Sequence, residues 1–320
     1  MILTLTPNPS IDATLALNET INPGTVHRAS QVSQVAGGKG VNVTHAVHLA
    51  GVKSVALLPA HKGDHFLSLM EEAHIPFDAV AMPGTVRINT AVTEPNGRTT
   101  KINGPGPVLD ESVQSALTSS LGALAIGADW VVLAGSLPKG VPTEWYAMLV
   151  DAIRTAAPQA KVAVDTSDAP MVALSERLET SAPNLIKPNG LELGQLTGTD
   201  GEALEAAAEK GDFSGVVEAA RVVVKRGIGE VLVTLGGAGA VLVTADGAWA
   251  ATPPPTKVVS TVGAGDSSLA GYILARRAGK DFAESLRQSV AYGSAAAALP
   301  GTQIPTPEQI NIDQTIVSSL

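Results

Sequence analysis

The strongest chemical signal in the sequence is a pair of glycines followed directly by an aspartate, Gly263-Ala264-Gly265-Asp266. Apolar residues after Asp266 recur at helical spacing, which places the motif at the start of a predicted helix. Glycines there let backbone N–H groups approach an anion, and the helix dipole favours negative charge. Asp266 could then accept a proton from a hydroxyl that attacks a phosphoryl group. The alternative is that Asp266 only caps the helix.

A second glycine cluster occupies residues 36–43 and runs into a stretch of helical spacing that Gly51 ends. Gly38 permits close approach of the backbone, while Lys39 and Asn42 carry groups that bind substrate oxygens. The Walker motif is excluded, because it needs a longer glycine spacing and a Ser or Thr after the Lys. A purely structural turn is the alternative.

A third motif, Lys187-Pro188-Asn189, follows a short apolar strand, and Glu192 comes three residues after Asn189. At a helix start, residues with this spacing share a face, so Asn189 and Glu192 could organise a hydrated Mg²⁺ ion near phosphates. The same pair fits a capping box, in which the two side chains only terminate the helix. The sequence leaves both interpretations open.

The segments Asp12–Leu17 and Arg87–Thr93 both alternate with period 2. The second meets Arg98–Asn103 across Asn96-Gly97, a dipeptide that favours a tight hairpin turn. Arg87 and Asn89 stand two residues apart on one arm, so they share a face. Lys101 and Asn103 have the same spacing on the other arm. The two pairs would offer cations and amides to a sugar phosphate, although solvated strand residues would look the same.

Short β-branched runs alternate with helical patterns, which predicts an α/β fold whose mostly parallel central sheet is covered by helices on both faces. The predicted strands are Ile2–Leu5, Val55–Leu58, Val131–Ala134, Val162–Asp165, Leu185–Lys187 and Val231–Leu235, and two of the predicted helices are Glu111–Ile126 and Thr143–Ala157. Ligands bind at the carboxyl ends of strands in such sheets. Ser136, just after one strand, is therefore placed to donate to a phosphate.

Extended segments without crossover helices predict a second, smaller sheet built from residues 11–35 and 84–108. The α/β body then comprises residues 1–10, 36–83 and 109–320. A small sheet attached to a large body is suited to act as a lid, which in phosphoryl transfer keeps water from competing with the intended acceptor.

The composition limits the class of protein. Of the 320 residues, 45% are hydrophobic, and the net charge is −9, which argues against nucleic acid and anionic membranes as partners. There is no Cys, so thiolate metal sites and cysteine nucleophiles are excluded. The N-terminal run reads as a strand rather than a signal peptide, and no long apolar stretch occurs. We expect a soluble cytoplasmic protein.

Taken in order, these motifs resemble the PfkB (ribokinase-like) carbohydrate kinase family over nearly the whole chain. The two glycine clusters are similar to its two signatures, and together with Lys187-Pro188-Asn189 and Glu192 they are highly specific. Four segments are similar to the branch that acts on ketohexose phosphates, nearest 1-phosphofructokinases and then tagatose-6-phosphate kinases: Thr6–Asp12, Arg87–Asn89, Asn103–Pro107 and Gly135–Pro138. The stretch Lys210–Gly215 departs from the family pattern.

The resemblance implies ligand roles by motif. On the sugar side it places Asp12, Gly38 and Asn42 toward the sugar and Lys39, Arg87 and Ser136 toward its phosphate. On the nucleotide side it places Lys187, Asn189, Thr234, Gly236 and Gly239, with Gly263 to Gly265 as the anion hole and Asn189 and Glu192 as the magnesium motif. It also implies a β-sheet lid that pairs with a second subunit, giving a homodimer.

The leading hypothesis is a kinase that uses ATP and Mg²⁺ to phosphorylate O6 of fructose 1-phosphate, with Asp266 as the base. The alternative within enzymes is a kinase for tagatose 6-phosphate or fructose 6-phosphate. From another class, the chain could be a non-catalytic sugar-phosphate sensor on the same scaffold.

Overall fold

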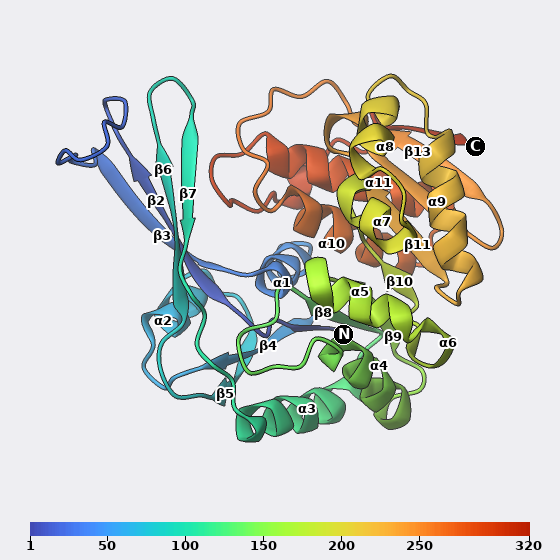
Figure 1. Ribbon diagram of the computed structural model, residues 1–320, viewed down its shortest axis with the longest axis horizontal. Coiled ribbons are helices and arrows are strands. Elements are labelled where there is room, and N and C mark those ends of the chain that lie inside the picture. The colour runs from blue at the N-terminus through green and yellow to red at the C-terminus, as the bar shows by residue number, and fades with distance from the viewer.

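The computed structural model describes residues 1–320, and its strands form two separate sheets (Figure 1). The large sheet has the order β14-β13-β12-β11-β10-β9-β8-β1-β4-β5. Its strands are β1 (Ile2–Leu5), β4 (Ser54–Ala60), β5 (Phe77–Ala81), β8 (Trp130–Ala134), β9 (Lys161–Asp165), β10 (Leu185–Ile186), β11 (Glu230–Thr234), β12 (Ala240–Thr244), β13 (Ala248–Thr252) and β14 (Ile316–Ser319). Neighbours from β11 to β5 are parallel, and β12 to β14 add an antiparallel edge.

Helices cover both faces of this sheet (Figure 1). They are α1 (Lys39–Leu49), α2 (His65–Glu72), α3 (Glu111–Ala125), α4 (Trp145–Ala156), α5 (Asp168–Glu176), α6 (Leu178–Ser181), α7 (Gly190–Thr197), α8 (Gly201–Ala208), α9 (Ser214–Lys225), α10 (Ala264–Arg277) and α11 (Phe282–Ala297). Because side chains alternate along a strand, Leu3 enters one hydrophobic core and its neighbour Ile2 the other. The α1, α10 and α11 helices close the smaller core, and helices α2 to α9 close the larger one.

The small sheet has the order β3-β2-β6-β7 and projects from the body (Figure 1). Its strands are β2 (Ser10–Ala16), β3 (Gln31–Gly37), β6 (Arg87–Thr93) and β7 (Thr99–Asn103). The β6–β7 hairpin turns at Gly97, which has a φ of 86°, and the Asn96 side chain accepts a hydrogen bond from the Arg98 N–H at 2.9 Å. The Asn-Gly signal therefore predicted this turn correctly.

The α/β class, the parallel sheet and the separate small sheet are confirmed, and the predicted strands and helices agree with the structure to within two residues at their ends. Four strands of the large sheet were not predicted: β5 and the antiparallel edge strands β12 to β14. The antiparallel strands β11 and β12 are joined by a short hairpin connection that contains the 3₁₀ turn Gly236–Ala238. No helix combines the length and apolar character needed to traverse a bilayer.

Gly239, at the end of that turn, has a φ of 98°, and a Cβ added there would overlap the carbonyl oxygen of Ala251 in β13. We expect Gly239→Ala to lower the free energy of unfolding by roughly 2–4 kcal/mol, because it combines backbone strain with a steric overlap. Gly237→Ala is the matched control, since open space surrounds Gly237 and its φ is not positive. Urea denaturation of both variants checks this; equal losses would contradict it.

Candidate active site

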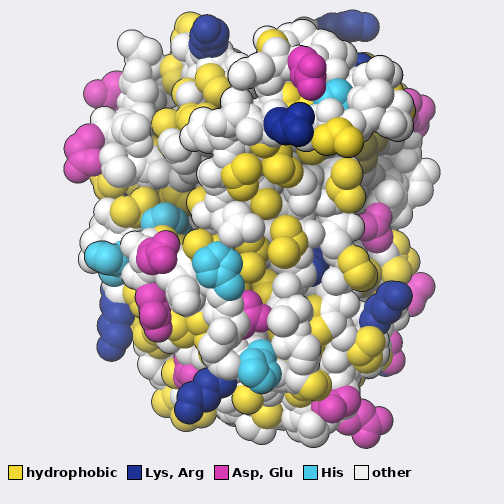
Figure 2. Space-filling view, turned by 90° about the vertical axis from the view of Figure 1, so that its left-hand side faces the viewer, with side chains coloured by type: hydrophobic (Ala, Val, Ile, Leu, Met, Phe, Trp, Pro, Cys, Tyr) yellow, Lys and Arg dark blue, Asp and Glu magenta, His cyan; other side chains and the backbone are white.

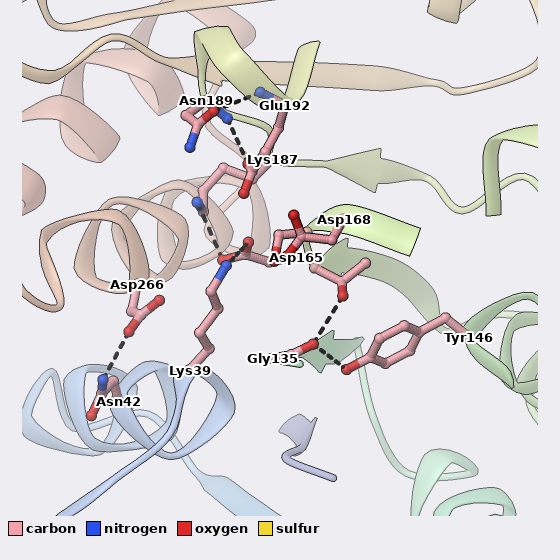
Figure 3. Close-up of polar contacts among 12 residues, drawn as sticks. Lys39, Asn42, Gly135, Tyr146, Asp165, Asp168, Lys187, Asn189, Glu192 and Asp266 are labelled. Carbon is pink, nitrogen blue, oxygen red and sulfur yellow. Dashed lines mark hydrogen bonds and ion pairs between the residues drawn. The ribbon is translucent and has the colours of Figure 1, made fainter. Parts of the chain in front are cut away.

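Six of the residues singled out in the sequence lie together where parallel strands of the large sheet end (Figure 3): Lys39, Asn42, Lys187, Asn189, Glu192 and Asp266. Asp165 is the last residue of β9, Lys187 follows β10, and the loop after β8 begins at Gly135. The N-termini of α1, α7 and α10 face the same region (Figure 3). This arrangement matches the rule that open α/β sheets bind ligands beyond the carboxyl ends of their strands.

Asp266 lies in the first turn of α10 and is only 7% exposed. The N-cap is Gly263, in the left-handed conformation with a φ of 78°, and no side chain caps the helix. The Asp266 carboxylate instead accepts a hydrogen bond of 2.8 Å from Nδ2 of Asn42 in α1 (Figure 3). The capping interpretation of Asp266 is therefore wrong, and its carboxylate is directed into the region between α1 and α10.

Burial and, to a smaller extent, the charge of Asp165 raise the pKa of Asp266 to about 6. The Asn42 hydrogen bond and the positive charges of Lys39 and Lys187 oppose that shift. A carboxylate with this pKa is ionised near neutral pH and still accepts a proton readily, which is the property a general base requires.

The start of α10 offers unpaired backbone donors. The N–H groups of Gly265 and Asp266 donate to no group of the protein. A Cβ at Gly265 would lie 3.2 Å from Nζ of Lys187, so a side chain there would crowd the ammonium group. Two free N–H groups at a positive helix end, beside a lysine, can bind an anion.

Lys39 and Lys187 both contact Asp165, a residue that the sequence analysis did not assign to the site (Figure 3). The Nζ–Oδ distances are 2.8 Å from Lys39 and 3.2 Å from Lys187. Asp165 is 0% exposed; burial raises its pKa, but the two ammonium groups outweigh burial and hold the pKa below its usual range. Its position at the end of a predicted strand was the only signal in the sequence that could have identified it.

Asn189 and Glu192 form the capping box that the sequence offered as the simpler interpretation. The Asn189 side chain accepts from the Glu192 N–H at 2.7 Å, and Glu192 Oε2 accepts from the Asn189 N–H at 2.9 Å. Burial raises the pKa of Glu192. The second carboxylate oxygen of Glu192 makes no hydrogen bond within the protein, so capping leaves one acceptor available.

On the small sheet, the Asp12 carboxylate accepts hydrogen bonds from Ser10 at 2.8 Å and from Asn89 at 3.1 Å. Burial raises the pKa of Asp12, against the effect of these two bonds. The Asn89–Asn103 register places Asn103 beside Asn89, and Lys101 lies two residues further along β7. Asn103 and Lys101 are both exposed.

Asn8 joins the small sheet to the body. Its backbone carbonyl accepts from Arg87 at 3.2 Å, and its side chain donates to Ser136 at 3.2 Å. Asn8 is 7% exposed and, like Asp165, was not a predicted site residue. The structure thus brings Arg87 and Ser136 together, but it places Lys39 with Asp165 and not with that pair.

The remaining predicted positions differ in their surroundings. Gly38 has a φ of 122°, and a Cβ there would press on Thr6, so its conformation requires glycine. Gly236 is open, with nothing near an added Cβ, and Thr234 is half-buried at the end of β11. At Gly239 a Cβ would overlap β13, so the fold requires glycine at this position whether or not a ligand binds there.

We expect Asp266→Asn to raise the free energy of unfolding at pH 8 by roughly 1–3 kcal/mol, since it removes a buried charge whose pKa is shifted upward by about two units. Above pH 6 the native state keeps Asp266 ionised at a cost in stability. Between pH 6 and pH 4 that carboxylate takes up a proton in the native state before it does so in the unfolded chain, so the gain shrinks as pH falls. Denaturant unfolding across this range measures it.

Asp64→Asn is the contrasting control. The Asp64 carboxylate caps α2 and accepts from the N–H groups of Phe66 at 2.9 Å and Val86 at 2.8 Å. Its replacement should lower stability. If Asp266→Asn lowered stability in the same way, Asp266 would have a structural role that its contacts do not indicate.

Comparison with known proteins identifies the family of the chain. The family model described as pfkB family carbohydrate kinase matches residues 6–309. The 1-phosphofructokinase of Rhodobacter capsulatus is 35% identical over 316 residues, which cover 97% of this chain and 94% of that protein. The 1-phosphofructokinase of Bacillus subtilis is 31% identical and is covered over 92% of its length.

Solved structures of phosphofructokinases are also similar to this chain. Phosphofructokinase-2 from Escherichia coli, in complex with potassium, superimposes with a TM-score of 0.85 at 30% identity, covering 96% of each chain. The matched region contains both glycine clusters and the buried carboxylates between them. The chain therefore belongs to the pfkB family of carbohydrate kinases and is a sugar kinase.

Proposed function

We propose that the protein transfers the terminal phosphoryl group of ATP to O6 of fructose 1-phosphate, giving fructose 1,6-bisphosphate. The observation that carries the proposal is the buried Asp266 carboxylate, held by Asn42 next to free N–H groups and two lysines. The similarity to several 1-phosphofructokinases at 31–35% identity supports this choice of substrate.

In the proposed reaction, Asp266 accepts the proton of the sugar hydroxyl as that oxygen attacks the γ-phosphorus in line. A new O–P bond forms while the bond to the β,γ-bridging oxygen breaks, and ADP leaves. The N–H groups of Gly265 and Asp266 stabilise the charge on the transferring phosphoryl group, because the start of α10 already presents them in a fixed geometry.

The nucleotide side fits ATP and Mg²⁺. Lys187 and Gly265 lie side by side, and a Cβ at Gly265 would enter the space beside the ammonium group. The Glu192 oxygen that capping leaves free, with Asn189, would hold Mg²⁺ through water. Bound there, the ion would neutralise phosphate charge. Thr234 and Gly236 would border the nucleotide.

The sugar side uses the small sheet as a lid. Asp12 would bind sugar hydroxyls, Lys39 would reach the substrate phosphate from α1, and Arg87 with Ser136 would bind that phosphate. Asn8 contacts both of these phosphate residues, which supports their acting as one group. Lys101 and Asn103 would close over the ligand from the outer strand, and residues 11–35 and 84–108 would move as the lid.

A second candidate activity is phosphorylation of fructose 6-phosphate or tagatose 6-phosphate. An E. coli phosphofructokinase-2 structure in complex with fructose-6-phosphate is 30% identical to this chain with a TM-score of 0.82. That identity is nearly equal to the value for the B. subtilis 1-phosphofructokinase, 31%. Other 1-phosphofructokinases reach 35% identity, which favours fructose 1-phosphate, and direct comparison of substrates decides between the two activities.

We expect kcat/KM for fructose 1-phosphate to exceed that for fructose 6-phosphate and tagatose 6-phosphate when ADP release is followed at saturating MgATP. Asp266→Asn should reduce kcat about 10²–10⁴-fold with little change in substrate affinity, because only proton transfer is lost. A higher kcat/KM for one of the 6-phosphates would make that sugar phosphate the substrate instead. Near-normal turnover of Asp266→Asn would show that Asp266 is not the catalytic base. If the unaltered protein turned over none of the three sugar phosphates, a non-catalytic sensor would be favoured.

The lid supplies a surface for a second copy of the chain. Val32, Ile88 and Ile102 lie on the face of the small sheet opposite Asp12 and are 60%, 46% and 62% exposed. Figure 2 shows the lid side of the molecule, where apolar side chains gather in the middle of the view and most charged ones lie toward its edges. We propose that two lids pair through this face to form a homodimer.

Ile102→Asp should convert the dimer to a monomer in light scattering after size-exclusion chromatography, because it places a charge in the paired apolar face. Ile126→Asp is the control, since Ile126 is 73% exposed at the end of α3, away from the lid. An unaltered protein that is already monomeric, or an Ile102→Asp variant that stays dimeric, would exclude pairing through this face.

A further inference from the structure

Asp165 is a fully buried carboxylate that the proposed reaction does not use. Figure 3 shows it between the side chains of Lys39, from α1, and Lys187, from the segment after β10. The proposed function gives these lysines to different ligands, Lys39 to the sugar phosphate and Lys187 to the nucleotide. One carboxylate thus touches a residue of each ligand site.

The backbone around Asp165 is held in place from two sides. Its carbonyl oxygen accepts from the Gly135 N–H at 2.9 Å, and the Lys187 N–H donates to Val164 at 3.2 Å. The Gly135 carbonyl in turn accepts from the hydroxyl of Tyr146 at 2.7 Å and from Thr166 at 2.9 Å (Figure 3). The carboxylate therefore stands at a fixed point, whereas both lysines have long flexible side chains.

The charges explain why such an anchor is needed. Two ammonium groups that share one site repel each other, and free lysine side chains would turn toward solvent. One negative charge between them offsets the repulsion and leaves a net positive charge for phosphate oxygens. Lys187 is 5% exposed, so it cannot gain this stabilisation from water.

We propose that Asp165 is a positioning residue that holds the ammonium groups of Lys39 and Lys187 in the arrangement that receives the phosphates of the two substrates. This inference rests on the proposed function for its assignment of the two lysines. It predicts that replacing Asp165 weakens the binding of both ligands, the sugar phosphate through Lys39 and the nucleotide through Lys187.

Kinetics of Asp165→Asn test the inference on the best substrate of the unaltered protein. We expect the KM values for sugar phosphate and for ATP each to rise about tenfold or more, since both lysines lose their anchor. In a Lys39→Met background, Asp165→Asn should change the KM for sugar phosphate less than about twofold while still raising the KM for ATP. In a Lys187→Met background the pattern should reverse.

Glu230→Gln is the matched control. Glu230 is another buried carboxylate, at the opposite end of β11, where it accepts from the Tyr272 hydroxyl at 2.7 Å and pairs with Arg276 at 3.2 Å. Both substitutions should lower the midpoint of thermal unfolding, but Glu230→Gln should leave both KM values unchanged. Unaltered KM values in Asp165→Asn, or effects that simply add to those of the lysine variants, would overturn the inference.

If Asp165→Asn cannot be purified folded, Lys187→Met carries the test. Without Lys187 the whole charge of Asp165 acts on Lys39, so the Kd for fructose 1-phosphate, measured by calorimetry without nucleotide, should rise about threefold or more. An unchanged Kd would overturn the inference. Failure of the proposed function is distinguished by the unaltered protein, which would then turn over no sugar phosphate.

Discussion

Burial of negative charge at the carboxyl edge of the large sheet is the constraint on which the site depends. Asp165 and Asp266 are both shielded from water, and the charge of the first raises the pKa of the second. Two buried carboxylates are tolerated close together only where cations and hydrogen-bond donors surround them. Lys39, Lys187 and Asn42 supply those partners, so α1, β9, β10 and α10 must meet at one place.

The site has two halves, one around the buried carboxylates and one on the small sheet. In the first half, Asp165 pairs with two lysines, Asp266 accepts a hydrogen bond from Asn42, and the free donors are backbone N–H groups that suit a phosphoryl group. Around Asp12 and Arg87 the groups lie on the small sheet, which contacts the body through Asn8. Under the proposed function, the first half performs the chemistry and the second closes over the sugar, which would exclude water.

Membership of the pfkB family accounts for the scaffold and the kinase chemistry, and the choice of sugar phosphate depends on finer features. The cations lie in two places: Lys39 and Lys187 both contact Asp165, whereas Arg87 contacts Asn8, which also contacts Ser136. Under the proposed function, the cations that meet the phosphate of the acceptor determine which end of the sugar faces Asp266. Substrate orientation is therefore a property of these side chains and not of the fold.

The sequence by itself determined the α/β class, the hairpin at Asn96-Gly97 and the helix start at Asp266, because periodicity and turn chemistry act between residues close in the chain. The weakly patterned edge strands β12 to β14 gave no comparable signal. Only the tertiary structure decided that Asp266 bonds to Asn42, 224 residues away, and that Lys39 pairs with Asp165, 126 residues away. Such partners are chosen by which strand ends and helix starts converge, and local patterns do not contain that information.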